Sequence, residues 1–169
     1  MSNMTVKEFF VYCVEGEKAG FIRVLDTLTV LPRKNLDYRP DPKSKSGFEL
    51  AHMFANEFAM IEKFLNTGKW NMKEEAHVSY NNIDEIKSEA TRAIDAVTAK
   101  AKRMSEEDWE SEGEAWEKMK KSEFAFDMLF DLVHHRGQIS TYIRSMGGKN
   151  PSIYGPSADV TMADLMKQS

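Results

Sequence analysis

The sequence predicts an all-α protein that folds as a four-helix bundle. Four long segments carry apolar residues three and four positions apart, which is the spacing of an amphipathic helix. The prolines fall in only two segments, so the remainder of the chain can form long helices. No part of the sequence alternates apolar and polar residues over the length of a half-buried strand. A chain of 169 residues can bury one sizeable core, and we expect a single domain over residues 1–169.

The first two helices are expected on either side of a long loop. Apolar residues recur on one face from about Thr5 to Thr29. The segment that follows, "LPRKNLDYRPDPKSKS", is too rich in proline and charge to continue a helix. A second helix is expected over about Ser46 to Asn66, because Thr67-Gly68 is a typical helix end.

The second half of the chain predicts two more helices. One is expected over about Ile83 to Met104, with Asn82 as its N-cap. The acidic and then basic segment "SEEDWESEGEAWEKMKK" should turn near Gly113. The last long helix is expected from about Lys118 to Met146, where Gly147-Gly148 ends it. The remaining segment, "KNPSIYGPSADVTMADLMKQS", is expected to wrap back over the bundle and has room for one terminal helical turn.

The composition excludes several classes of function. A net charge of −4 argues against a large basic surface for nucleic acid. There is no run of about 20 apolar residues that could span a membrane, and the N-terminus does not resemble a secretory signal. The single cysteine, Cys13, rules out an internal disulfide framework and lies on an apolar helix face, as an inert core thiol would. We therefore expect a cytoplasmic protein without nucleic-acid or membrane partners.

Two ionisable residues fall on the apolar face of the last helix. Asp131 and His135 share the stripe formed by Phe124, Met128, Ile139, Tyr142 and Met146. His134 belongs to a flanking, more polar face. A carboxylate inside a bundle is costly unless it is paired or bound to a metal. Asp131 and His135 could therefore form an ion pair or supply two ligands of one metal ion, because side chains four residues apart can converge.

A third metal ligand would have to come from another helix, and His52 is the candidate. It lies nearly opposite the bulky stripe of its helix, among small residues that leave space for a ligand: Ala51, Ala55 and Ala59. The predicted metal site is therefore His52, Asp131 and His135. The bulky stripe would then pack on the other helices or on a second subunit, and we expect a homodimer. His77 lies in a polar loop and is expected to be exposed.

Over nearly its whole length the chain resembles the DinB/YfiT-like superfamily of metal-binding four-helix bundles. The resemblance is carried by "HHRGQISTYIRSMGGKNPSIYGPSAD", by "YRPDPKSKSGFELAHMFANE" and by Trp70. It implies one metal ligand from the second helix, at His52, and two from the last. The usual His-x-x-x-His pair falls on Asp131 and His135, so an aspartate replaces the first histidine. This departure leaves the metal open among zinc, nickel, manganese and ferrous iron.

The resemblance also implies candidate functions. Some similar proteins are metal-dependent thiol transferases, in which the metal binds a low-molecular-weight thiol that attacks an electrophilic small-molecule substrate in detoxification or stress response. Asn56 and Tyr142 would line such a pocket; no catalytic side chain is assigned. The alternatives are a non-catalytic, stress-inducible metal-binding protein and a hydrolase with a metal-activated water. A fourth ligand, Asp127 or His134, would favour a structural ion.

Other residues of the motif have expected roles. Arg136 should point off the core, toward the C-terminal segment or a carboxylate. Gly137 should allow close helix approach. Gln138 or His134 could orient a metal ligand from behind, and Tyr154 is expected to anchor the C-terminal segment.

Overall fold

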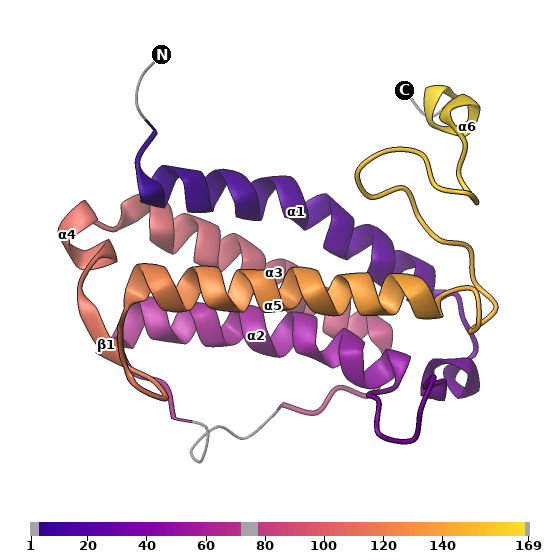
Figure 1. Ribbon diagram of the computed structural model, residues 1–169, viewed down its shortest axis with the longest axis horizontal. Helices are drawn as coiled ribbons and strands as arrows, with labels where there is room; N and C mark the ends of the chain where they lie inside the picture. The colour runs from indigo at the N-terminus through magenta and orange to yellow at the C-terminus, as the bar shows by residue number, and fades with distance from the viewer. Residues whose placement is uncertain (1–3, 72–77, 168–169) are drawn as a thin grey trace.

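The computed structural model describes residues 4–71 and 78–167, and it confirms the predicted helical bundle (Figure 1). Two of the long helices run in one direction and two in the other. Ion pairs between Asp26 and Lys87 and between Glu15 and Lys102 join the first of these helices to the third in antiparallel order. The four long helices are α1 (Val6–Thr29), α2 (Gly47–Thr67), α3 (Ile83–Arg103) and α5 (Lys121–Tyr142).

Capping residues explain where these helices begin. Thr5 and Ser46 each cap the helix that follows, and in both cases a glutamate three residues later closes a capping box. Asn82 accepts a hydrogen bond from the backbone N–H of Glu85 and caps α3, as predicted. Helix α2 ends at Gly68, whose φ of +65° is the left-handed conformation that glycine adopts without strain.

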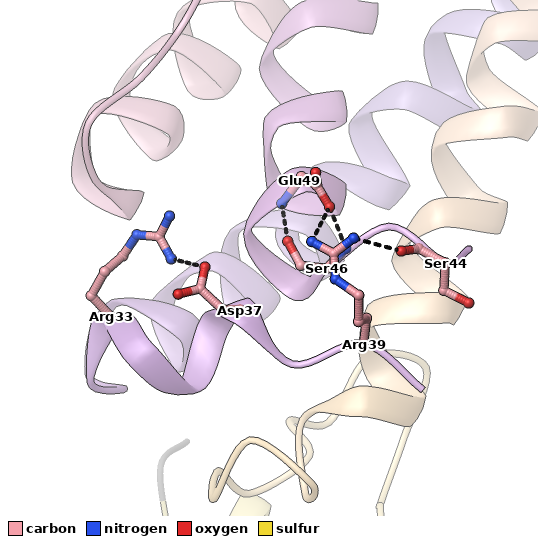
Figure 2. A network of polar contacts seen from close by, with 6 residues as sticks. All are labelled: Arg33, Asp37, Arg39, Ser44, Ser46 and Glu49. Carbon is pink, nitrogen blue, oxygen red and sulfur yellow. Dashed lines mark hydrogen bonds and ion pairs between the residues drawn. The ribbon is translucent and has the colours of Figure 1, made fainter. Parts of the chain in front are cut away.

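The predicted long loop after α1 contains one short 3₁₀ helix, η1 (Arg33–Asp37). Figure 2 shows how polar contacts hold the remainder of this loop to the start of α2. The Arg39 guanidinium pairs with the Glu49 carboxylate at 3.1 Å and also donates to the carbonyl oxygen of Ser44. The same carboxylate accepts a hydrogen bond from the backbone N–H of Ser46 at 2.6 Å. The loop is thereby tied to the N-terminus of α2.

The connection between α3 and α5 differs from the prediction. It contains a helical turn, α4 (Glu106–Trp109), and a hairpin of two short strands, β1 (Glu112–Glu114) and β2 (Lys118–Lys120). The sequence shows no alternation here because strands of three residues are too short to produce it. Gly113 packs so closely on the end of α2 that a Cβ would lie 2.5 Å from the carbonyl oxygen of Gly68. Because β2 occupies residues 118–120, α5 begins at Lys121 and not at Lys118.

The interior of the bundle is apolar and rich in aromatic rings. Phe21 of α1 packs edge-on against Phe54 and Phe58 of α2, and all three side chains are fully buried. The bulky stripe of α2 therefore faces the other helices of the same chain. Cys13 is half-buried against this core, and burial raises the pKa of its thiol, which fits the expected inert role. Within the described part of the chain, no helix is long and apolar enough to cross a membrane.

The C-terminal segment returns over the bundle beside α1 and ends in α6 (Met162–Met166) (Figure 1). Arg136 of α5 is almost fully buried and pairs with Glu17 of α1 and with the hydroxyl of Tyr154 in this segment. Arg136 was expected to point toward the C-terminal segment or a carboxylate and contacts both, and the anchoring role of Tyr154 is confirmed. The expectation that Arg136 points off the core was wrong, because its guanidinium is buried over the ring of Phe21. The expected role of Gly137 was wrong: it lies on the exposed face of α5, where a Cβ would have no neighbour within 4 Å.

Candidate metal centre

Three ionisable side chains converge where α2 and α5 pack against each other. Glu57 comes from the middle of α2, and Asp131 and His135 come from successive turns of α5. The Nε2 atom of His135 lies 3.4 Å from Oε1 of Glu57 and 3.4 Å from Oδ2 of Asp131. One potential ligand atom from each residue lies within 4.8 Å of the other two. This is the Glu57–Asp131–His135 cluster.

The cluster is buried on one side and open on the other. The side chain of Glu57 is only 3% exposed, that of His135 is 11% exposed and that of Asp131 is 46% exposed. Among the described residues, neither carboxylate oxygen of Glu57 has a hydrogen-bond partner of ordinary geometry. Burial raises the pKa of Glu57, because an ionised carboxylate in a dry environment needs a compensating charge. A proton or a cation must therefore compensate Glu57.

His135 is oriented by contacts on both sides of its ring. Its Nδ1 atom lies 2.9 Å from Oε1 of Gln138, one helical turn further along α5. Its Nε2 atom faces the carboxylates of Glu57 and Asp131. The contact with Glu57 is the main cause of a raised pKa for His135, opposed by burial and supported by Gln138 and the charge of Asp131.

Of the three ligands predicted from sequence, the structure brings together Asp131 and His135 but not His52. His52 lies five residues before Glu57, which places it about 140° away around α2. Its ring packs against Phe48 and Tyr80, at centroid distances of 4.7 and 5.3 Å. Burial lowers the pKa of His52, so the imidazole there is held neutral. The small residues beside His52 do not open a shared ligand space with α5, and Glu57 takes the expected place of the histidine.

Glu57 has a sequence signal that the search for histidines missed. It lies three residues after Phe54 and four before Ile61, on the apolar stripe of α2. A carboxylate on such a stripe meets the same criterion that singles out Asp131. Glu57 is therefore as anomalous in the sequence of α2 as Asp131 is in that of α5.

The other candidate residues surround the cluster without joining it. Asp127 and His134 are exposed and are not members of the converging group, so neither is a fourth ligand within it. Asn56 is half-buried next to Glu57 in the chain, and Tyr142 packs edge-on against Tyr38 at 5.6 Å. Their pocket-lining role remains a prediction. His77 lies outside the described residues.

The donor set fits a small divalent cation. Two ligands bound tetrahedrally at about 2.1 Å from one ion lie about 3.4 Å apart, which is the distance from His135 Nε2 to each carboxylate. A cation would also compensate the buried carboxylate of Glu57, which His135 alone contacts at 3.4 Å among the basic groups of the described residues. With three protein ligands, coordination positions would remain for solvent on the side of the half-exposed Asp131.

The fold and the cluster together define a class: a helical bundle with a carboxylate-rich candidate metal centre between two of its long helices. The model of the DinB family matches residues 4–164, and the chain belongs to this family. No curated protein matches the sequence.

Two solved structures share the fold. A DinB-like protein from Bacillus subtilis superposes with a TM-score of 0.67 at 16% identity, covering 82% of this chain and 92% of its own. A DinB-like protein from Bacillus cereus gives the same TM-score at 18% identity, covering 87% of this chain and 97% of its own.

Proposed function

We propose that the protein binds one divalent metal ion through Glu57, Asp131 and His135. The observation that carries this proposal is the Glu57 carboxylate, which is almost fully buried and has no hydrogen-bond partner of ordinary geometry among residues 4–71 and 78–167, while a second carboxylate and an imidazole face it. Such a group is expected only where a cation or a proton compensates it. His135 faces both carboxylates at the same distance, and one imidazolium would leave one of the two negative charges without compensation.

The donor types favour particular metals. Two carboxylates and one imidazole make an oxygen-rich set, and carboxylates suit manganese while imidazole suits iron and zinc. We therefore propose Mn²⁺, Fe²⁺ or Zn²⁺ as the occupant rather than Ni²⁺, which prefers a set richer in nitrogen. Asp131 contributes to this preference because it stands where the family resemblance leads one to expect a histidine.

Metal content of purified variants tests the ligand set. After equilibrium dialysis against Zn²⁺ or Mn²⁺, the wild-type protein should retain one equivalent by elemental analysis. Glu57→Gln and His135→Ala should lose it, because each removes a ligand that the others cannot replace. His52→Ala and Cys13→Ala are the matched controls and should retain the ion. Loss in His52→Ala with retention in Glu57→Gln would overturn the assignment in favour of the sequence-based one.

We further propose thiol transfer as the reaction of the centre. A bound ion would supply Lewis acidity, which lowers the pKa of a thiol and holds the thiolate as a nucleophile. Access for a small thiol and an electrophile would come from the side of Asp131, with Asn56 and Tyr142 as pocket-lining residues. The assay incubates metal-loaded protein with low-molecular-weight thiols and electrophilic substrates. Turnover that is lost in Glu57→Gln supports the proposal, and no turnover across the panel contradicts it.

The charge of the cluster favours an alternative, a non-catalytic metal site. Two carboxylates neutralise a divalent cation, so the ion attracts a thiolate less strongly than it would with three neutral imidazoles. The ion would then serve to cross-link α2 and α5 and to stabilise the bundle. A metal-dependent rise in melting temperature without turnover of thiols, or of hydrolysable esters that report a metal-activated water, would favour this alternative.

A further inference from the structure

We propose that Gln138 is a positioning residue of the metal centre: its amide oxygen accepts a hydrogen bond from Nδ1–H of His135 and so turns the Nε2 lone pair toward Glu57 and Asp131. This inference rests on the proposed metal binding and assigns a role to a residue that does not contact the ion.

The geometry of the imidazole ring supports this role. Nδ1 of His135 lies 2.9 Å from Oε1 of Gln138, a normal hydrogen-bond distance. On the opposite edge of the ring, Nε2 lies 3.4 Å from one oxygen of each carboxylate. A neutral imidazole carries its proton on one nitrogen only, so an acceptor at Nδ1 leaves the lone pair on Nε2. That is the nitrogen at the centre of the cluster.

The spacing of His135 and Gln138 along α5 brings their side chains within hydrogen-bond distance. Residues three apart on α5 lie on the same face, so the amide reaches the histidine without any change in the backbone. Gln138 is half-buried, which reduces competition from water for the Nδ1 proton. His134, the other sequence-based candidate for this role, is exposed and makes only a tilted ring contact with His135 at 5.6 Å.

Loss of the acceptor should weaken metal binding without removing a ligand. Without Gln138, the proton of His135 can move to Nε2, where it blocks the site, and the ring can rotate. Removing such an outer hydrogen-bond partner of a metal-bound histidine typically costs about 10- to 100-fold in affinity. A glutamate at the same position keeps an acceptor of the same reach and should preserve binding.

The experiment measures Zn²⁺ affinity by competition with a chromophoric chelator in four proteins. We expect Gln138→Leu to bind about 10- to 100-fold more weakly than wild type, and Gln138→Glu to bind at least as tightly as wild type. Ser140→Ala is the matched control, because the Ser140 hydroxyl donates to the carbonyl oxygen of Arg136 in its own helix and does not contact the His135 ring. Circular dichroism establishes that each variant is folded; if Gln138→Leu is not, Gln138→Met replaces it.

Nitrogen NMR of the His135 ring in the zinc-loaded protein gives a second measurement that a purely structural role would not change. The wild type should show a protonated Nδ1 in slow exchange with water, and Gln138→Leu should exchange this proton faster. Equal affinity and equal exchange in both proteins would overturn the inference. If the wild type binds no Zn²⁺ or Mn²⁺ at all, the proposed metal centre itself is wrong, which is a distinct outcome.

Discussion

Glu57 and His135 should make the proposed metal binding depend on pH. Burial raises the pKa of Glu57, and the contact with Glu57 raises the pKa of His135 above its ordinary value of about 6.5. Both groups must be deprotonated to ligate an ion. Lowering the pH through the raised pKa of His135 therefore puts a proton in competition with the metal, and affinity should fall as pH falls.

Calorimetric titration with Zn²⁺ in buffers of different ionisation enthalpy measures this competition. At pH 6.5, which lies below the raised pKa of His135, binding should release protons. For each proton released, the apparent affinity should rise tenfold per pH unit. Above the raised pKa of His135 the release should diminish. Affinity that does not change between pH 6 and pH 8 would show that neither group carries a proton that the ion displaces.

At the scale of single residues, the sequence predicted two members of the cluster and missed the third. Asp131 and His135 were found because their positions on an apolar stripe are anomalous for ionisable groups. His52 was chosen by residue type, since histidine is a common ligand, yet its ring packs against Phe48 and Tyr80. Glu57 meets the criterion that identified Asp131 and His135, because it is an ionisable residue on an apolar stripe. The packing of the two helices decides which face of α2 meets α5. This face cannot be deduced from the sequence of either helix alone.

At the scale of elements, periodicity and caps predicted the long helices well. Thr5, Ser46 and Asn82 mark helix starts through hydrogen bonds that are local in sequence. The hairpin before α5 was missed because its support is not local: the N–H of Glu114 donates to the carbonyl oxygen of Gly68 at 2.7 Å. A contact between residues 46 positions apart produces no periodic pattern in the sequence of the hairpin.

Helix α5 is also tied to the C-terminal segment by Arg136, and this contact should stabilise the fold. Its guanidinium lies over the rings of Phe21 and Tyr154, with its charge paired to Glu17. The side chains of Arg136 and Glu17 are 3% and 21% exposed. Removal of the guanidinium leaves the Glu17 carboxylate without a compensating charge, so Arg136→Ala should lower the free energy of unfolding by about 3 kcal/mol.

Urea denaturation followed by circular dichroism checks this value. Tyr154→Phe removes only the hydroxyl that donates to Glu17 at 2.8 Å, and it should cost about 1 kcal/mol. Arg144→Ala is the control, because its ion pair with Asp159 is half-exposed and should contribute less than about 1 kcal/mol. Equal losses in Arg136→Ala and Arg144→Ala would contradict a buried anchor for the C-terminal segment.

At the scale of the whole molecule, the outer face shared by α1 and α5 carries a row of aromatic side chains: Phe9, Phe126 and Phe130. The ring centroids of Phe126 lie 6.2 Å from Phe9 and 5.9 Å from Phe130. Phe130 is 64% exposed and Phe9 is 49% exposed, whereas the bulky stripe of α2, which was expected to pack on the other helices or on a second subunit, is buried inside the bundle. For the homodimer expected from sequence, we propose this aromatic row as the surface that meets a second copy.

In a two-fold symmetric dimer the same row would meet itself, so one charge introduced on it appears twice at the contact. Phe130→Asp should therefore convert a dimer into a monomer, because two carboxylates would be buried against apolar rings without compensation. Val30→Asp changes a residue that is 79% exposed at the end of α1 and should leave the assembly unchanged. Light scattering coupled to size-exclusion chromatography measures the mass of each protein. The aromatic row is not the contact surface if the wild type has the mass of one chain. The same conclusion holds if the Phe130→Asp variant stays dimeric.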